Sequence, residues 1–342
     1  MSTFFARACA LGVTLSAIGM APAIAQDKTV ELRFAHWLPG QHALAKLGFE
    51  PWAKSLEAAT KGSIKVMFFP AQQLGKAADH YDMARDGIAD MTWVSPGYQT
   101  GRFPIFEVSE LPFQIGSTGG GSAAIHSWYQ KYAATEMKDI KVCLLHNHIG
   151  ALHSKRPISE PSQIKGLKMR SSNGMVAQMT TQLGGTNVQV SAVEARDALD
   201  KGVADGLTYP WRSLVTFNIH KAVKYHLDAK FYSGNFVWAI NKSWYNRLSP
   251  AQKKAVDDHC NEDWAQKIGV AYGDFEDSGL AMVEKEPGHT VIKPTPAQLA
   301  AWKKAVEPIT VEWAKSVEKA GGKPQEVLDH LRSELAARNA AY

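Results

Sequence analysis

The sequence predicts an α/β protein that folds as two similar lobes with one long helix bracing both. Three observations carry this prediction. Strand-like and helix-like segments alternate from about residue 30 onward, one short sequence phrase occurs twice, and one helical pattern is unusually long. The alternation runs from a strand at Val30–Ala35, through a helix at about Ala43–Thr60, to a strand at Ile64–Phe69. This order indicates a parallel sheet layer with a right-handed crossover.

A phrase that occurs twice suggests that the lobes share one design. Asp86–Trp93 (DGIADMTW) recurs as Lys201–Tyr209 (KGVADGLTY), and a proline follows each copy. The accompanying elements are helix-like stretches at Lys76–Arg85 and Ala192–Asp200, a strand at Leu167–Arg170 and a helix at Gly174–Leu183. Ligands bind beyond the carboxyl ends of strands in open α/β sheets. Two such edges facing each other would form a cleft, although Gly-x-Ala-Asp is also a common phrase at helix ends.

The long helical pattern begins at a clear start signal. Ser249 is suited to the N-cap, Pro250 to the first helical position and Gln252 to the third. Spaced apolar residues then continue from Ala251 to about Glu286. At roughly 1.5 Å per residue, one helix of this length would span both lobes. Thr295 begins a second pattern in the same way, and two closing helices are predicted at Ala297–Ala320 and Pro324–Ala337.

The first residues, Met1–Ala25, are typical of a signal peptide. Arg7 is followed by an apolar run and by the small residues Ala23 and Ala25. Cys9 precedes the apolar run, which argues against a lipoprotein signal. No later segment has the roughly 18 apolar residues of a membrane span. We therefore expect a soluble mature protein in the bacterial periplasm.

The remaining length suggests about two domains. We expect one lobe at 27–148 plus 235–275 and the other at 149–234 plus 276–342, with crossings near Asn147–Gly150 and Ser233–Phe236. Hydrophobic residues make up 45% of the chain and charged residues 21%, as in ordinary globular proteins. The formal charge of +5 falls to +4 without Arg7, and the basic residues are dispersed. This pattern argues against a nucleic-acid partner.

The residues suggest no catalytic or metal centre. There is no Gly-x-Ser-x-Gly elbow and no His-Glu-x-x-His motif, although paired carboxylates of a glycosidase remain an alternative. His146 and His148 would share one face of a strand, but no third metal ligand is evident. We therefore expect no enzyme activity, cofactor or metal. Cys143 could pair with Cys260 in an oxidising compartment, but its apolar run suits a buried free thiol, and we favour unpaired thiols.

Several phrases, in this order and spacing, resemble a known family. They are Phe69–Gly75 (FPAQQLG), Gly101–Pro104 with Glu110–Phe113, Lys155–Ile158, Gly166–Arg170 (GLKMR) and Gly202–Gly206. The chain resembles the solute-binding proteins of tripartite ATP-independent periplasmic (TRAP) transporters, of the C4-dicarboxylate-binding type. The resemblance implies a two-lobed periplasmic-binding-protein fold, closure around a carboxylate, and a small and a large integral membrane subunit as partners.

Arg170 is the leading candidate for binding that carboxylate. The resemblance assigns this role to the arginine of the Gly-Leu-Lys-Met-Arg motif, and a guanidinium matches a carboxylate with two parallel hydrogen bonds. In many relatives the stretch that corresponds to Leu207–Trp211 is polar and carries an Asn that also contacts the ligand, whereas this chain carries Tyr209 and Trp211 there. Their rings favour an aromatic or apolar monocarboxylate over a compact diacid.

Further candidates lie at other predicted strand ends and crossings, and the alternative for each is packing in the core. They are Trp93, Ser95 and Tyr98; His36 and Trp37; Asn147 and His148; and Phe236. We therefore predict a solute-binding protein for a small organic acid. The alternatives are a C4-dicarboxylate binder of the same system, a binding protein of an ATP-driven importer, and a secreted hydrolase.

Overall fold

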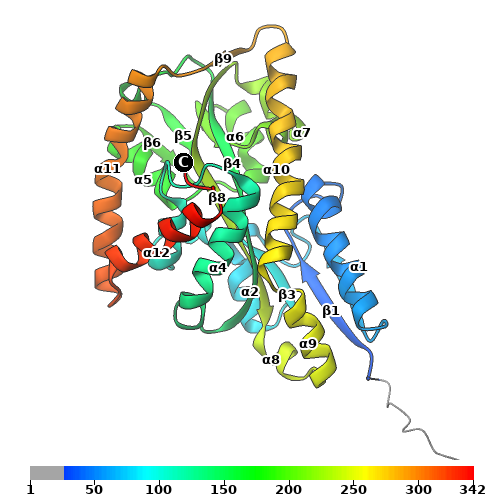
Figure 1. Cartoon of the computed structure of the whole chain (residues 1–342). Helices are drawn as coiled ribbons and strands as arrows, with labels where there is room; N and C mark the ends of the chain where they lie inside the picture. The colour runs from blue at the N-terminus through cyan, green and yellow to red at the C-terminus, as the bar shows by residue number, and fades with distance from the viewer. Residues whose placement is uncertain (1–26) are drawn as a thin grey trace, which may run out of the picture.

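Two long antiparallel strands, β4 (Ile140–Ser154) and β8 (Tyr225–Asn241), carry the chain between the two halves of the molecule. The computed structural model describes residues 27–342, so the predicted signal peptide lies outside the described residues. One nine-stranded sheet has the order β2-β1-β3-β8-β4-β7-β5-β6, and β9 (Thr290–Ile292) pairs with β8. Strand pairing therefore continues from one lobe into the other, because β4 and β8 belong to both (Figure 1).

Each half contains three short parallel strands in the same arrangement. The first half has β1 (Val30–Ala35), β2 (Ile64–Phe69) and β3 (Met91–Val94), with β1 in the middle. The second half has β5 (Lys168–Arg170), β6 (Thr186–Val188) and β7 (Gly206–Tyr209), with β5 in the middle. β3 then joins β8, and β7 joins β4, both antiparallel. The two-lobed α/β fold predicted from the sequence is confirmed.

The twice-occurring phrase makes equivalent hydrogen bonds in the two lobes. Gly87 and Gly202 adopt left-handed conformations, with φ of 73° and 69°, after a helix. In one copy the Asp90 carboxylate accepts from the Arg33 backbone N–H at 3.0 Å, and in the other the Asp205 carboxylate accepts from the Lys168 N–H at 2.9 Å. The phrase is therefore a structural repeat rather than a chance recurrence.

The register of this repeat corrects one sequence-based equivalence. Phe34 is opposite Met91 in the first lobe, and Met169 is opposite Gly206 in the second. Met91 and Gly206 are therefore equivalent positions. Two residues further along each strand, Trp93 corresponds to Thr208, and not to Tyr209 as the sequence suggested. The second copy was predicted one residue too long because both copies end in an aromatic residue.

Helices cover both faces of the sheet (Figure 1). Their bounds are α1 Glu50–Ala59, α2 His80–Asp86, α3 Pro104–Glu107, α4 Thr118–Glu136, α5 Gly174–Gln182, α6 Ala195–Asp200, α7 Trp211–Thr216, α8 Lys242–Asn246, α9 Pro250–Asp258, α10 Glu262–Lys285, α11 Pro296–Lys319 and α12 Pro324–Ala337. A π-helical turn, Ala45–Phe49, precedes α1. None of the helices within residues 27–342 is long and apolar enough to cross a membrane.

The predicted long helix is broken in two. Ser249 caps α9 with the expected capping box, but α9 ends at Asp258, and Asn261 caps α10 by accepting from the Trp264 N–H at 3.0 Å. The apolar spacing gave no sign of this break. α10 nevertheless contacts α4 and the π-helical turn in one half and α7 and β9 in the other. The bracing role is therefore confirmed for α10 alone (Figure 1).

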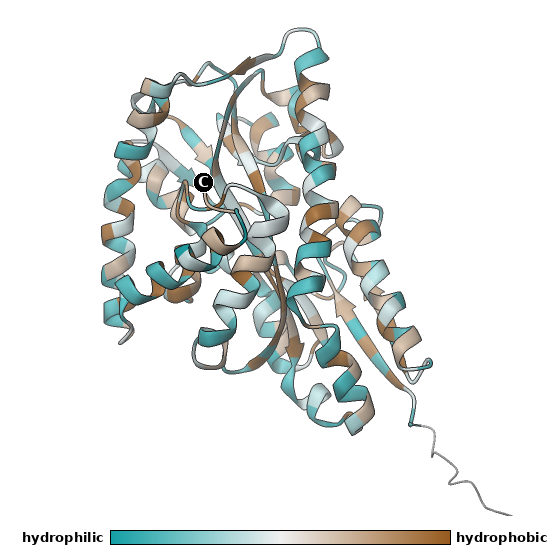
Figure 2. Ribbon diagram, in the orientation of Figure 1, coloured by the Kyte–Doolittle hydropathy of each residue, from teal (hydrophilic) through white to brown (hydrophobic). Residues whose placement is uncertain are grey.

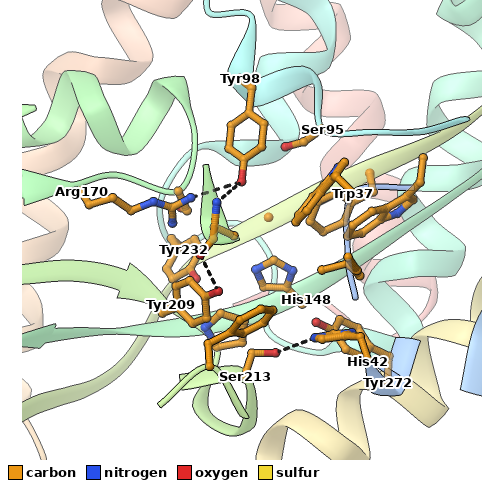
Figure 3. A pocket seen from close by; sticks show the side chains of 18 residues that line it. Trp37, His42, Ser95, Tyr98, His148, Arg170, Tyr209, Ser213, Tyr232 and Tyr272 are labelled. Atoms are coloured by element: carbon orange, nitrogen blue, oxygen red, sulfur yellow. Dashed lines mark hydrogen bonds between the residues drawn. The ribbon is translucent and has the colours of Figure 1, made fainter. Parts of the chain in front are cut away.

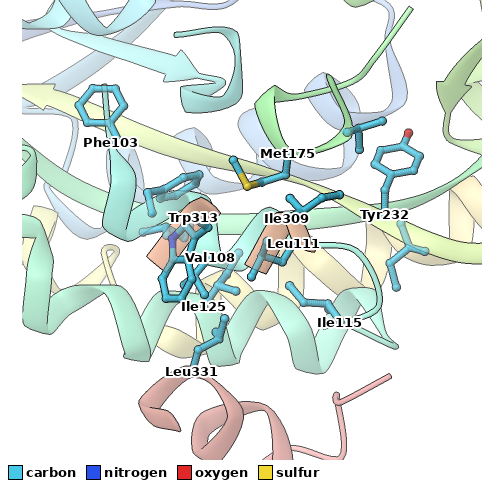
Figure 4. Packing of buried hydrophobic residues seen from close by; sticks show 14 of the residues in the cluster. Phe103, Val108, Leu111, Ile115, Ile125, Met175, Tyr232, Ile309, Trp313 and Leu331 are labelled. Atoms are coloured by element: carbon cyan, nitrogen blue, oxygen red, sulfur yellow. The ribbon is translucent and has the colours of Figure 1, made fainter. Parts of the chain in front are cut away.

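The largest core lies between the sheet and α4, α11 and α12. Ile125 of α4, Trp313 of α11 and Leu331 of α12 are each no more than 2% exposed, and they converge in Figure 4. The outer side of α11 is largely hydrophilic in Figure 2, as the periodicity of a half-buried helix requires. This core holds the closing helices against the sheet, away from the cleft.

The two cysteines of the described chain form a disulfide, which corrects the expectation of free thiols. Cys143 of β4 and Cys260 of the break between α9 and α10 have Cα atoms 4.5 Å apart. They are separated by 117 residues, so no local pattern could show that the break lies over β4. The disulfide therefore attaches the amino-terminal end of the bracing helix to a strand shared by both lobes.

We predict that replacing both cysteines with alanine lowers the free energy of unfolding by about 2–5 kcal/mol, because the bond restricts a long loop in the unfolded chain. Urea unfolding followed by circular dichroism measures the change. Reduced wild-type protein is the matched control and should unfold like the double variant. Equal midpoints for the oxidised wild type and the double variant would contradict the prediction.

Candidate ligand-binding site

A pocket lies between the lobes, beyond the carboxyl ends of β1, β3, β5 and β7. The empty space between the side chains of the pocket, including its open mouth, is about 470 Å³. The lining residues, drawn in Figure 3, are Trp37, Leu38, His42, Trp93, Ser95, Tyr98, His148, Arg170, Ser172, Ala192, Tyr209, Pro210, Ser213, Phe217, Tyr232, Gly234, Phe236 and Tyr272.

Arg170 brings a buried positive charge to this pocket. It is the last residue of β5, is 2% exposed, and donates to the carbonyl oxygens of Val190 (3.1 Å) and Thr208 (3.2 Å). Its Nη2 also donates to the Tyr98 hydroxyl at 3.2 Å (Figure 3). These partners orient the guanidinium but are neutral. Because a buried charge without a counter-ion is costly, the pocket is suited to an anion.

Arg170 is the only Arg, Lys, Asp or Glu among the described residues that line the pocket. Two lining histidines do not add charge at neutral pH. Burial lowers the pKa of His42 to about 4, and burial, helped by the charges of His146 and Arg170, lowers that of His148 to about 3. In the register of the repeat, the residue equivalent to Arg170 is Ala35. The first lobe therefore provides no second arginine at the matching position.

Two rings lie across glycines where β4 and β8 cross between the lobes. His148 of β4 is opposite Gly234 of β8, and Gly150 of β4 is opposite Tyr232 of β8. A Cβ atom at Gly234 would lie 2.5 Å from the His148 ring, and one at Gly150 would lie 2.3 Å from the Tyr232 hydroxyl oxygen. Both glycines are therefore required where the strands cross between the lobes.

An aromatic wall faces the arginine. Trp93 lies between Trp37 and Phe236, stacked on each with ring centroids 4.3 Å apart. The Trp93 indole N–H donates to His146 Nε2 at 2.9 Å, which fixes the middle ring from behind. Figure 3 shows Trp37 on the opposite side of the pocket from Arg170, with His148 between them. The site thus combines one cationic end with a flat apolar side.

Hydrogen bonds join the lobes on two sides of the pocket. Tyr98 of the first lobe accepts from Arg170 and from the Ala192 backbone N–H, at 3.2 and 3.0 Å. His42 Nε2 lies 3.3 Å from Ser213 Oγ, and Ser213 donates to Glu276 of α10. Burial raises the pKa of Glu276. The lobes are therefore closed against one another in this structure.

Most of the residues predicted for the site line this pocket. They are Trp37, Trp93, Ser95, Tyr98, His148, Arg170, Tyr209 and Phe236. Tyr209 lies beside Arg170, whose guanidinium carbon is 5.8 Å from the ring centroid, and its hydroxyl donates to the Ala192 carbonyl at 3.0 Å. Whether each lining residue contacts a ligand stays a prediction.

Trp211, His36 and Asn147 lie outside the lining. Trp211 begins α7, so its ring packs edge-on against His153, with centroids 4.9 Å apart, and faces a separate cavity. His36 packs on Phe49, with centroids 4.9 Å apart. Asn147 points to the opposite side of β4 from His148 and accepts from Ser122 Oγ of α4 at 2.8 Å. Successive strand residues face opposite sides of a sheet, which explains His36 and Asn147.

Several lining residues could not be predicted from a sequence motif. His42 and Ser213 lie in loop and helix starts without a motif, and Tyr272 was one of several spaced apolar residues of the long helix. Tyr232 was visible only as part of an aromatic strand. Within residues 27–342, no group of three His, Cys, Asp or Glu side chains is placed to hold a metal ion.

Three solved structures show the same fold. A TRAP solute-binding protein from Rhodoferax ferrireducens, in complex with copurified benzoate, is 28% identical, with a TM-score of 0.86 over 91% of this chain and 99% of that one. A marine metagenome protein described as specific for aromatic acids, with 3-hydroxybenzoate, is 30% identical, with a TM-score of 0.86 and the same coverage. A Bordetella bronchiseptica protein with bound mandelate is 26% identical, with a TM-score of 0.84 over 90% and 99%.

The family match covers most of the chain. Residues 34–316 match the family described as bacterial extracellular solute-binding protein, family 7. This span includes the repeat, the pocket, both crossing strands and the bracing helix. The chain therefore belongs to this family, the periplasmic solute-binding proteins of TRAP transporters.

Proposed function

We propose that this protein captures a monocarboxylate with an aromatic body in its cleft and delivers it to the membrane subunits of a TRAP transporter. The observation that carries the proposal is the buried guanidinium of Arg170, which faces the wall formed by Trp37, Trp93 and Phe236. A carboxylate would neutralise the arginine, and a ring would cover the aromatic wall. Stacked rings typically contribute about 0.5–1.5 kcal/mol per pair beyond area burial.

The charge of the pocket argues against a C4-dicarboxylate. A second carboxylate would be buried without a cation, because Arg170 is the only permanently charged side chain among the described lining residues. His42 and His148 could compensate only by binding a proton, which their burial opposes. The aromatic acids carried by the three related proteins support the same choice.

The arrangement of His42, Ser213 and Glu276 supports binding rather than hydrolysis. In a catalytic triad the histidine accepts the serine proton and the acid orients the histidine. Here the Leu44 N–H donates to His42 Nδ1 at 3.2 Å, so the neutral ring carries its proton on Nε2, facing Ser213. Ser213 in turn donates to Glu276. The histidine is therefore a donor to the serine and is not placed to activate it.

Export and lobe movement belong to the same proposal. Met1–Ala25 would be removed as a signal peptide during export to the periplasm, where the family resides. The lobes would be 27–148 plus 235–275 and 149–234 plus 276–342, which divide β4 and β8 where His148 pairs with Gly234. Ligand release would require Tyr98 to separate from Arg170 and His42 from Ser213.

We predict that Arg170→Ala lowers the affinity for benzoate by about two to four decades, since removing one side of a buried charge pair costs roughly 3–5 kcal/mol. Arg170→Lys should restore only part of it, because lysine keeps the charge but loses the planar fork. Isothermal calorimetry measures both effects. Arg102→Ala is the matched control, since Arg102 pairs with Asp82 outside the pocket and its loss should leave the affinity unchanged. Near wild-type binding by Arg170→Ala would refute the assignment.

We also predict that benzoate or mandelate raises the melting temperature and binds more tightly than succinate or malate. One carboxylate meets one arginine, whereas a second carboxylate would lose its hydration without a charged partner. A thermal-shift screen followed by calorimetry tests this order, and recovery of unchanged ligand distinguishes binding from turnover. Tight malate or succinate binding with no response to aryl acids would support the dicarboxylate alternative instead.

A further inference from the structure

We infer that the indole N–H of Trp37 binds an oxygen atom on the ring of the ligand, so that the preferred ligand is a one-ring aromatic acid with a hydroxyl group remote from its carboxylate. The inference rests on the proposed function and identifies the ligand class more narrowly. The hydrogen-bond donors of the pocket divide into those with a protein partner and those without one.

Two donors of the pocket, the Trp93 indole and the Tyr209 hydroxyl, already bond to acceptors in the protein. The Trp93 indole donates to His146 at 2.9 Å, and the Tyr209 hydroxyl donates to the Ala192 carbonyl at 3.0 Å. Trp37 differs from its stacking neighbour Trp93. It is only 3% exposed, and its Nε1 is buried without a hydrogen-bond partner among the described residues. An indole N–H can only donate and has no alternative tautomer, so in this position it needs an acceptor.

Leaving a buried donor unpaired is unfavourable, so such groups are rare in native proteins. Three other lining atoms also lack partners within the described chain: Tyr232 OH, Ser172 Oγ and His148 Nδ1. Ser172 follows Arg170 closely in sequence, and both hydroxyls can turn toward a carboxylate at the arginine. The histidine nitrogen can be left unprotonated. A carboxylate bound at Arg170 would therefore leave the Trp37 indole N–H as the donor still without an acceptor.

The position of Trp37 relative to Arg170 sets the size of the ligand. The Tyr98 side chain is close to both groups: its ring centroid is 6.0 Å from that of Trp37, and its hydroxyl oxygen is 3.2 Å from Arg170 Nη2. One tyrosine side chain therefore reaches from the arginine to the indole. Figure 3 shows them on opposite sides of the pocket. With its carboxylate on Arg170, a single-ring acid would present its distal substituent to Trp37.

The test compares benzoate with 3- and 4-hydroxybenzoate by calorimetry, in the wild type, Trp37→Phe and Trp93→Phe. A hydrogen bond contributes roughly 0.5–1.5 kcal/mol, so at least one hydroxybenzoate should bind the wild type about 2- to 10-fold more tightly than benzoate. This ratio should fall to about one in Trp37→Phe. Trp93→Phe is the matched control, because it removes a neighbouring indole whose N–H is already bonded. It can weaken all three acids, but the ratio should persist.

The unaltered protein offers a second measurement that needs no variant. At the position where the hydroxyl helps, the corresponding methylbenzoate has a similar size but no acceptor, and it should bind no better than benzoate. Equal binding of benzoate and both hydroxybenzoates, or a hydroxyl gain that survives Trp37→Phe, would overturn this inference while leaving the proposed function intact. Failure of every aromatic acid to bind would refute the proposed function and this inference together.

Discussion

A guanidinium buried without a carboxylate beside it is the constraint on which the arrangement of this site depends. Arg170 is held by the carbonyls of Val190 and Thr208 and by the Tyr98 hydroxyl, which orient its charge but do not neutralise it. Desolvating a charge costs several kcal/mol unless an opposite charge compensates. The other described residues of the lining are neutral or, for the histidines, kept neutral by burial. An anionic ligand therefore completes the electrostatics of the closed form, which links binding to closure.

The strands that join the lobes also shape the pocket. β4 and β8 are paired along most of their length, with register shifts between Val142 and Leu144 and between Gly150 and Leu152. The second shift lies beside the crossing, where the His148 and Tyr232 rings cover Gly234 and Gly150. The crossing therefore combines a change of strand register with two glycines covered by rings. The disulfide holds the start of α10 on β4, so the brace and the crossing strands form one connected frame.

The polar contacts across the cleft have a fixed direction. His42 Nδ1 accepts from the Leu44 N–H, so its Nε2 can donate to Ser213, and Ser213 donates to Glu276 on the bracing helix. This series connects a loop of the first lobe, a helix of the second and the brace. Protonation of His42 would place an N–H against the Leu44 donor, and burial disfavours the charged form. The neutral imidazole is therefore the form that suits the closed cleft.

The sequence alone determined the elements whose signals are local. The strands Val30–Ala35 and Ile64–Phe69 and the helix Pro324–Ala337 have the predicted bounds, because strand alternation, helix periodicity and the flanking Gly and Pro residues act over a few neighbours. The repeated phrase and the motif at Arg170 also indicated the two lobes and the carboxylate. The tertiary structure decided the rest. It set the break at Cys260 and its disulfide to Cys143, the exclusion of Trp211, His36 and Asn147 from the pocket, and the inclusion of His42, Ser213, Tyr232 and Tyr272. These features depend on contacts between residues that are far apart in the sequence. The periodicity of a sequence indicates which face of a helix or strand a side chain lies on, but it does not indicate which residue packs against that face.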